Sequence, residues 1–287
     1  MKTVVITGAS TGIGRASAEY LAGKGWTVFA GIRNLEDADA LRAENAGDIR
    51  PLLLDVTSDS DVADAVNFVS KALDGATLNG LVNNAGIAKM GPLAIQPLKD
   101  FEAHFSVNVF GMLRATQAFV PLLGADEART GTPGRIVNIT SVGGRIAAPY
   151  LGAYTATKHA NEAMTDTLRR ELVLYGIDAI AIGPGSVKTP IWEKAEKANK
   201  DGPYAKSDWA DSIDTFEDVM IRGGDEGGLD PKEVGEAIHK ALEDGTPKAR
   251  YAPVPNKLTN WIIPTRLPKR MLDKIFWKRF GLKQRSK

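Results

Sequence analysis

The sequence predicts an α/β fold, a doubly wound parallel sheet with helices on both faces. Short β-branched runs alternate with helical segments from residue 3 to residue 182. The runs are apolar on both faces, as strands between two helical layers must be. Strict alternation of strand and helix is typical of a parallel sheet with crossover helices.

The elements follow in chain order. The expected strands are Thr3 to Thr7, Thr27 to Ala30, Ile49 to Leu54, Leu78 to Val82, Arg135 to Ile139 and Ile177 to Ile182. The expected helices are Ile13 to Gly23, Leu35 to Ala46, Ser60 to Leu73, Lys99 to Leu123 and Tyr154 to Tyr175, each with helical periodicity or length.

The pattern changes after Pro184-Gly185. Residues 186–229 are polar, contain tryptophan and are punctuated by glycine, so we expect an irregular lid or binding loop there. Asp230-Pro231-Lys232-Glu233 then begins another helix. We expect one domain over residues 1–252 and a separate extension over 253–287, which prolines divide into short pieces.

Composition excludes several classes of function. Thirty-six basic residues nearly balance 35 acidic ones, so no global field favours nucleic acid. The chain has no cysteine and three scattered histidines, which argues against disulfides, a thiol nucleophile and a metal site. Neither a signal peptide nor a run of roughly 20 apolar residues is present, so the cytosol is the expected compartment.

A glycine-rich turn follows the first strand. Gly8, Gly12 and Gly14 leave the backbone uncovered where the next helix begins. A pyrophosphate needs such a backbone, with free N–H groups and the positive end of a helix dipole. The spacing G-x-x-x-G-x-G differs from the common dinucleotide fingerprint, and by itself it also fits plain turn geometry.

The end of the second strand bears on which dinucleotide binds. Arg33 stands where an acidic residue would accept hydrogen bonds from a ribose 2′-hydroxyl. Its guanidinium suits a 2′-phosphate, and Ser10 and Thr11 can add hydroxyl donors. NADP(H) is therefore favoured, with NAD(H) as the alternative. In a second interpretation Arg33 is a solvated arginine paired with the carboxylates at positions 36, 37 and 39.

Tyr154 and Lys158 are four residues apart on one helix face. A nearby ammonium would lower the pKa of the tyrosine, which could then exchange a proton with a carbonyl or alcohol oxygen. The pair alone is weak evidence, but Ser141 follows the fifth strand, where such sheets bind ligands. Asn108 is unusual inside a helix, and either a kink or a catalytic water explains it equally well.

These motifs together resemble the short-chain dehydrogenase/reductase family, in particular its retinol and hydroxysteroid dehydrogenase branch. The shared features are T-G-x-x-x-G-x-G, Leu54-Asp55-Val56, Asn83-Asn84-Ala85-Gly86, Asn108, Ser141, Tyr154-x-x-x-Lys158 and Pro184-Gly185, within residues 2–250. The resemblance implies a Rossmann-type domain with a seven-stranded sheet. It also implies that the chain forms a homodimer or homotetramer.

The resemblance also implies residue roles. Tyr154 would be the acid/base, Lys158 would hold the nicotinamide ribose, Ser141 would orient the substrate oxygen and Asn108 would keep a proton-relay water. Further dinucleotide contacts would come from Asp55 and Val56 at the adenine, Asn83, Ala85 and Gly86 at the ribose side, and Ile13 and Gly14 at the pyrophosphate and nicotinamide ends. Pro184 and Gly185 would also bind the cofactor, and Val187 and Thr189 after them would contact the carboxamide.

The substrate is expected to be small and hydrophobic. Candidate lining residues are Ser141, Ala147, Pro149, Tyr150 and Trp192, although ordinary packing explains about half of this apolar group equally well. The extension is basic and amphipathic, with Asp273 as its only acidic residue. It would either lie on an anionic membrane surface or pack over the cleft or a partner subunit.

The expected activity is hydride transfer between nicotinamide and a hydrophobic secondary alcohol or ketone, with Tyr154 as acid/base. Two alternatives belong to other classes. One is an NADP(H)-binding regulatory protein without turnover; the other is an epimerase or dehydratase built on the same site.

Overall fold

The structure is a computed structural model that describes residues 2–34, 36–43, 47–190 and 202–284. Within these residues a parallel seven-stranded sheet has the order β3-β2-β1-β4-β5-β6-β7. The strands are β1 (Thr3–Ile6), β2 (Thr27–Ile32), β3 (Ile49–Leu53), β4 (Gly80–Asn83), β5 (Arg135–Ile139), β6 (Asp178–Ile182) and β7 (Arg250–Tyr251). The predicted fold class and all six predicted strands are confirmed, with ends that differ by at most two residues.

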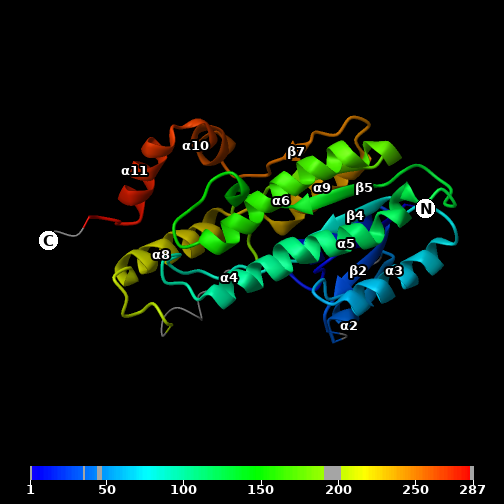
Figure 1. The fold of residues 1–287 in the computed structure, drawn as a ribbon, viewed down its shortest axis with the longest axis horizontal. Helices are drawn as coiled ribbons and strands as arrows, with labels where there is room; N and C mark the ends of the chain where they lie inside the picture. The colour runs from blue at the N-terminus through cyan, green and yellow to red at the C-terminus, as the bar shows by residue number, and fades with distance from the viewer. Residues whose placement is uncertain (1, 35, 44–46, 191–201, 285–287) are drawn as a thin grey trace.

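Helices cover both faces of the sheet (Figure 1). They are α1 (Gly12–Gly23), α2 (Glu36–Ala43), α3 (Asp59–Leu73), α4 (Leu98–Phe105), α5 (Met112–Phe119), α6 (Gly152–Glu171), α8 (Ala210–Gly227), α9 (Pro231–Glu243), α10 (Ile263–Arg266) and α11 (Lys269–Arg279). Shorter π and 3-10 turns are η1 (Ser106–Gly111), η2 (Pro121–Ala125), η3 (Val142–Gly144), η4 (Leu172–Tyr175) and η5 (Leu258–Ile262).

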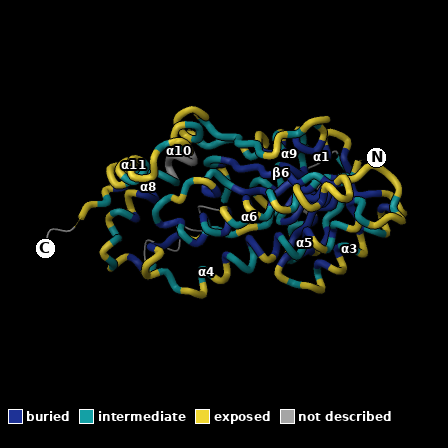
Figure 2. Tube along the Cα trace, turned by 45° about the horizontal axis from the view of Figure 1, so that its top comes forward, coloured by how far each residue is buried: buried dark blue, intermediate teal, exposed yellow. Residues whose placement is uncertain are grey.

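Two apolar cores hold the layers together. On one face, α1, α2 and α9 pack on inward side chains of the strands, for example Ile238 of α9 near Val4 and Val137. On the other face, α3, α5 and α6 pack on side chains such as Phe29 and Ile136. The central strands are buried almost throughout, and Figure 2 shows buried chain around β6. Burial on both faces explains why the strand sequences read as uninterrupted apolar runs.

The order in which strands are added to the sheet reverses at β1. The chain builds outward from β1 to β3 and then crosses back to β4, so β1 and β4 are hydrogen-bonded neighbours with crossovers leaving on opposite sides. Ligands of open α/β sheets bind at such a switch point, beyond the carboxyl ends of the strands.

The single helix predicted over residues 99–123 is wrong in detail. The segment is α4, η1, α5 and the start of η2, and η1 is a π-helical turn that contains Asn108. The Asn161 side-chain amide donates to the Asn108 carbonyl at 2.9 Å. In a regular α-helix this carbonyl would accept only from a backbone N–H of the next turn. Side chains that enter the backbone ladder produce this kind of local widening.

The irregular lid expected over residues 186–229 is also wrong in part. Helix α8 occupies its second half, and its buried Ile213 and Phe216 pack in a third apolar cluster with Tyr150 and Phe280. The rings of Phe216 and Phe280 are 4.9 Å apart. The end of the chain therefore folds back as α11 over α8, at the end of the molecule opposite the N-terminus (Figure 1).

Candidate active site

A cavity of about 460 Å³ opens at the switch point of the sheet. It is bordered by the turn after β1, the ends of β2 to β5 and the loop after β6. Of the residues predicted to bind cofactor or substrate, those that line it are Gly8, Ser10, Thr11, Gly12, Ile13, Arg33, Asp55, Val56, Ala85, Gly86, Ser141, Tyr154, Lys158, Pro184, Gly185, Val187 and Thr189.

The glycine turn is shaped by backbone that only glycine adopts easily. Gly8 and Gly12 have φ of +65° and +57°. A Cβ on Gly8 would lie 2.8 Å from the Ala85 Cα, because the turn after β1 touches the turn after β4. The two turns therefore form one continuous backbone wall.

Helix α1 begins at this wall without a side-chain cap. Its N-cap residue, Thr11, makes no capping hydrogen bond, and the first turn carries no acidic side chain. The first N–H groups of a helix have no partner within the helix. Together with Gly12 and Ile13 in the cavity lining, they offer donors and a positive dipole end to an anionic group such as a pyrophosphate.

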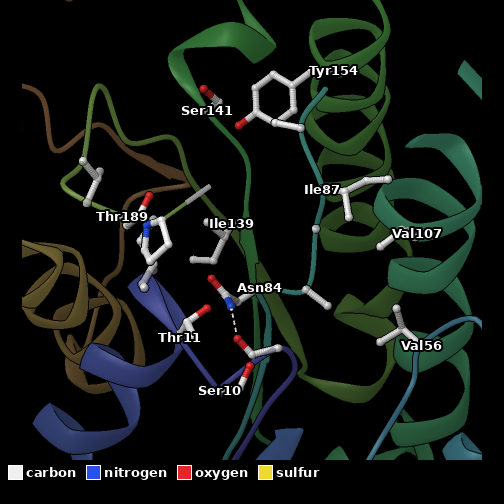
Figure 3. A pocket seen from close by; sticks show the side chains of 18 of the residues that line it. Ser10, Thr11, Val56, Asn84, Ile87, Val107, Ile139, Ser141, Tyr154 and Thr189 are labelled. Carbon is white, nitrogen blue, oxygen red and sulfur yellow. Dashed lines mark hydrogen bonds between the residues drawn. The ribbon is translucent and has the colours of Figure 1, made fainter. Parts of the chain in front are cut away.

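Ser141 and Tyr154 lie at the opposite end of the cavity from Ser10 and Thr11 (Figure 3). Ser141 follows β5 and caps η3, where its Oγ accepts from the Gly143 N–H at 3.0 Å. Tyr154 projects from the first turn of α6 and is hydrogen-bonded to Ser141 through the two side chains. Two hydroxyl groups from different elements therefore converge on one point of the cavity wall.

Lys158 lies one helical turn further along α6 and is 5% exposed. Its Nζ donates to the Ile139 carbonyl at 2.8 Å and lies 5.6 Å from the centre of the Tyr154 ring. Burial lowers the pKa of Lys158 to about 8, although the carboxylate of Glu162 acts in the opposite direction. At pH 7 the group is still mainly an ammonium.

The predicted lowering of the Tyr154 pKa is wrong for this structure. Burial raises the pKa of Tyr154, and only the hydrogen bond with Ser141 opposes that rise. One N–H of the Lys158 ammonium donates to the backbone carbonyl of Ile139. Tyr154 is therefore held protonated at neutral pH, as a proton donor should be.

Arg33 and Asp55 lie at the end of the cavity nearest β2 and β3. Burial would raise the pKa of Asp55, but hydrogen bonds from Thr57 and the guanidiniums of Arg33 and Arg114 outweigh it, so the pKa is lowered. Arg33 itself is exposed. Among the described side chains no ion pair joins it to positions 36 or 37, and the side chain at 39 lies outside the description.

Asn108 is buried away from the cavity, with 1% of its surface exposed. Its side chain accepts from the Ile87 N–H at 2.8 Å and donates to the Ile87 carbonyl and to Thr157 Oγ1. It therefore ties the loop after β4 to α6. Of the two roles weighed for Asn108 from the sequence, these contacts correspond to the structural one.

Two predicted cofactor contacts do not reach the cavity. Asn83 is buried and donates to Thr116 and Asn138, whereas the next residue, Asn84, lines the cavity and donates to the Gly8 carbonyl at 2.9 Å. Successive residues of a strand point to opposite sides of the sheet, so only one of the two asparagines can face the cavity. A Cβ on Gly14 would lie 2.2 Å from the Gly8 carbonyl oxygen, so Gly14 permits the close approach of α1 to β1 instead.

Most predicted substrate residues also lie away from this cavity. Ala147, Pro149 and Tyr150 do not line it, and the buried Tyr150 is hydrogen-bonded to Ser212 and packed on Phe216. Trp192 lies outside the described residues. Apolar side chains that the sequence did not single out enter the lining, notably Ile87, Val107 and Ile139 (Figure 3).

Residues 2–200 match the family model for short chain dehydrogenases. The chain belongs to the short-chain dehydrogenase/reductase family. It is therefore an oxidoreductase with a Rossmann-type fold and a nicotinamide dinucleotide site. The sequence-based resemblance is confirmed.

Three similar proteins illustrate the range of the family. The enzyme is 37% identical over 278 residues to the NADPH-dependent 3-dehydrocapnine reductase of Ornithobacterium rhinotracheale, covering 97% of each chain. It is 33% identical to retinol dehydrogenase 5 of Mus musculus, covering 95% of this chain and 86% of that one. A short-chain dehydrogenase/reductase from Burkholderia phymatum in complex with NAD superposes with a TM-score of 0.76 at 25% identity, covering 99% and 98%.

Proposed function

We propose that the enzyme transfers hydride between NADP(H) and a hydrophobic ketone or secondary alcohol, with Tyr154 as acid/base. The observation that carries the proposal is one cavity that joins the glycine turn after β1 to the Ser141–Tyr154 hydrogen bond. The nicotinamide would supply or accept the hydride. The side chains of the enzyme would orient the substrate oxygen and transfer the proton.

In carbonyl reduction, Ser141 would donate a hydrogen bond to the substrate oxygen and Tyr154 would transfer its proton there. The raised pKa of Tyr154 keeps that proton in place until the oxygen gains negative charge. The ammonium of Lys158, 5.6 Å from the ring centre, would stabilise the phenolate left behind. The same groups in reverse would remove the proton of an alcohol.

The residues around the cavity fit a dinucleotide with an extra phosphate. The N-terminus of α1 suits the pyrophosphate, and Arg33, Ser10 and Thr11 suit a 2′-phosphate. We assign Asp55 and Val56 to the adenine, Ala85 and Gly86 to the ribose side, and Val187 and Thr189 to the carboxamide. The NADPH dependence named for the Ornithobacterium relative supports this preference, whereas the NAD complex of the Burkholderia neighbour supports the alternative.

The hydrophobic substrate is proposed from the apolar lining beside Ser141 and from the retinol dehydrogenase relative. Consumption of NADPH with steroid ketones, retinal and acetophenone tests the activity. We expect stoichiometric oxidation of NADPH with at least one of them. An epimerase would regenerate the cofactor each cycle, and a regulatory protein would bind NADPH without consuming it.

We also propose that the enzyme is a cytosolic homodimer or homotetramer. The support is exposed apolar surface on α4 and η1: Leu98 and Phe110 are 69% and 57% exposed. Sedimentation equilibrium measures the assembly directly, and a monomer at micromolar concentration would contradict it.

The C-terminal helix α11 carries exposed apolar side chains beside basic ones. Phe276 and Phe280 face the protein body, whereas Met271 and Ile275 are 53% and 47% exposed beside basic side chains. None of the described helices is long and apolar enough to cross a membrane. We propose peripheral contact, tested by flotation with phosphatidylglycerol vesicles. Met271→Glu should reduce binding, and equal flotation with phosphatidylcholine vesicles would count against the charge contribution.

A further inference from the structure

A buried ion pair lies directly behind the catalytic residues. Glu162 follows Lys158 by one turn of α6, and its side chain is 7% exposed. Arg250 of β7 donates from Nε to both carboxylate oxygens at 3.0 Å. Thr140 donates to the same carboxylate at 2.6 Å, and Arg145 at 3.2 Å. A carboxylate this deeply buried needs such partners, and Glu162 has four donor contacts.

The guanidinium of Arg250 also holds the backbone of Ser141. Its Nη2 donates to the Ser141 carbonyl at 3.1 Å. The guanidinium lies against the end of β6, where a Cβ on Gly183 would be 1.9 Å from Nη2. Only a residue without a side chain at 183 leaves room for this contact. The backbone of Ser141 is thereby tied to β7, while the Ser141 hydroxyl contacts Tyr154.

An aromatic side chain from the C-terminal extension covers the ion pair. The Trp261 ring of η5 lies 4.1 Å from the Arg250 guanidinium carbon, within cation–π range. Trp261 is only partly exposed. Trp261 and Arg250, from consecutive elements, thus meet Glu162 of α6, which lies 88 residues before Arg250.

We propose that Arg250 and Trp261 are positioning residues, through which the C-terminal extension fixes Ser141 in its catalytic geometry, with Glu162 as the buried counter-charge. The proposal rests on the function assigned above to Ser141 and Tyr154. Neither Arg250, Trp261 nor Glu162 lines the cavity, so none of them touches the reacting groups there.

The same carboxylate acts on Lys158. Arg250 of β7 and Arg145 after η3 contact the Glu162 carboxylate, whereas the Tyr154 ring lies beside the Lys158 ammonium. Burial lowers the pKa of Lys158 to about 8, and the charge of Glu162 opposes that shift. Loss of the carboxylate would remove the charge that raises the pKa of Lys158, so burial would lower that pKa further.

The test compares Trp261→Leu with Trp277→Leu, a change of the same type at a residue of the extension that is 46% exposed. With NADPH and the best carbonyl substrate of the panel, we expect Trp261→Leu to lower kcat about tenfold through misplacement of Ser141. The Kd for NADPH should stay unchanged, and Trp277→Leu should behave as wild type. Trp261→Phe keeps an aromatic face and should restore most of kcat.

Arg250→Lys provides a second variant, because it keeps the charge beside Glu162 but loses the planar fork that also reaches Ser141. It too should lower kcat at constant Kd. Glu162→Gln should move the alkaline limb of kcat/KM to lower pH, an effect that a merely structural role would not produce. Wild-type kcat in both Trp261→Leu and Arg250→Lys, while Tyr154→Phe is inactive, would overturn this inference alone. Activity of Tyr154→Phe would instead overturn the proposed function.

Discussion

Tyr154→Phe is expected to lower kcat about a thousandfold, the usual effect of losing a general acid. The substitution removes the only hydroxyl that contacts Ser141 through a side-chain hydrogen bond in the described cavity lining. The ring, which lies in the first turn of α6, keeps its packing. Dinucleotide affinity should therefore stay within about twofold of wild type, because the glycine turn and the start of α1 are untouched.

Stopped-flow and steady-state assays with NADPH measure both quantities. Tyr175→Phe is the matched control, since Tyr175 ends η4 on the surface, 43% exposed and outside the cavity. It should retain full activity. Undiminished turnover in Tyr154→Phe would refute the assignment of Tyr154 as the acid/base.

Arg33→Asp is expected to shift the ratio of kcat/KM for NADPH over NADH by about a hundredfold toward NADH, since a charge-assisted contact is replaced by repulsion. Arg33 is exposed in the cavity, close enough to Asp55 to lower its pKa. The new carboxylate can accept hydrogen bonds from a ribose 2′-hydroxyl. The measurement is a pair of saturation curves with the same carbonyl substrate.

Arg266→Asp makes the same change of charge at an exposed residue of α10 that does not line the cavity. It should leave the cofactor ratio unchanged, which separates a local contact from an effect of net charge. An unaltered ratio in Arg33→Asp would rule out the phosphate contact and favour NAD(H) as the natural cofactor.

The strands and the placement of Tyr154 beside Lys158 could be predicted from sequence because local rules determine them. Apolar runs mark buried parallel strands, and the spacing of Tyr154 and Lys158 places them on one helix face. The glycine turn was predicted for the same reason, since Gly8 and Gly12 leave backbone uncovered where the next helix begins, and both line the cavity.

Contacts between distant segments could not be predicted in this way. The π turn at Asn108 depends on a hydrogen bond from Asn161, 53 residues away. The ion pair of Glu162 and Arg250 spans 88 residues. Burial of Tyr154 is likewise a property of the assembled layers, so the direction of its pKa shift could not be derived from the nearby lysine.

Helix α8 was missed because polar residues and glycines surround its buried Ile213 and Phe216.

The most direct measurement follows the hydride itself. NADPH carrying deuterium in place of both hydrogens at the reactive carbon of the nicotinamide, so that either face delivers label, is incubated with the enzyme and its best carbonyl substrate, and the product alcohol is analysed by mass spectrometry. We expect one deuterium on the former carbonyl carbon of each product molecule, formed by the wild type and not by Tyr154→Phe. A product without deuterium, or label that returns to the cofactor, would contradict net hydride transfer at this site.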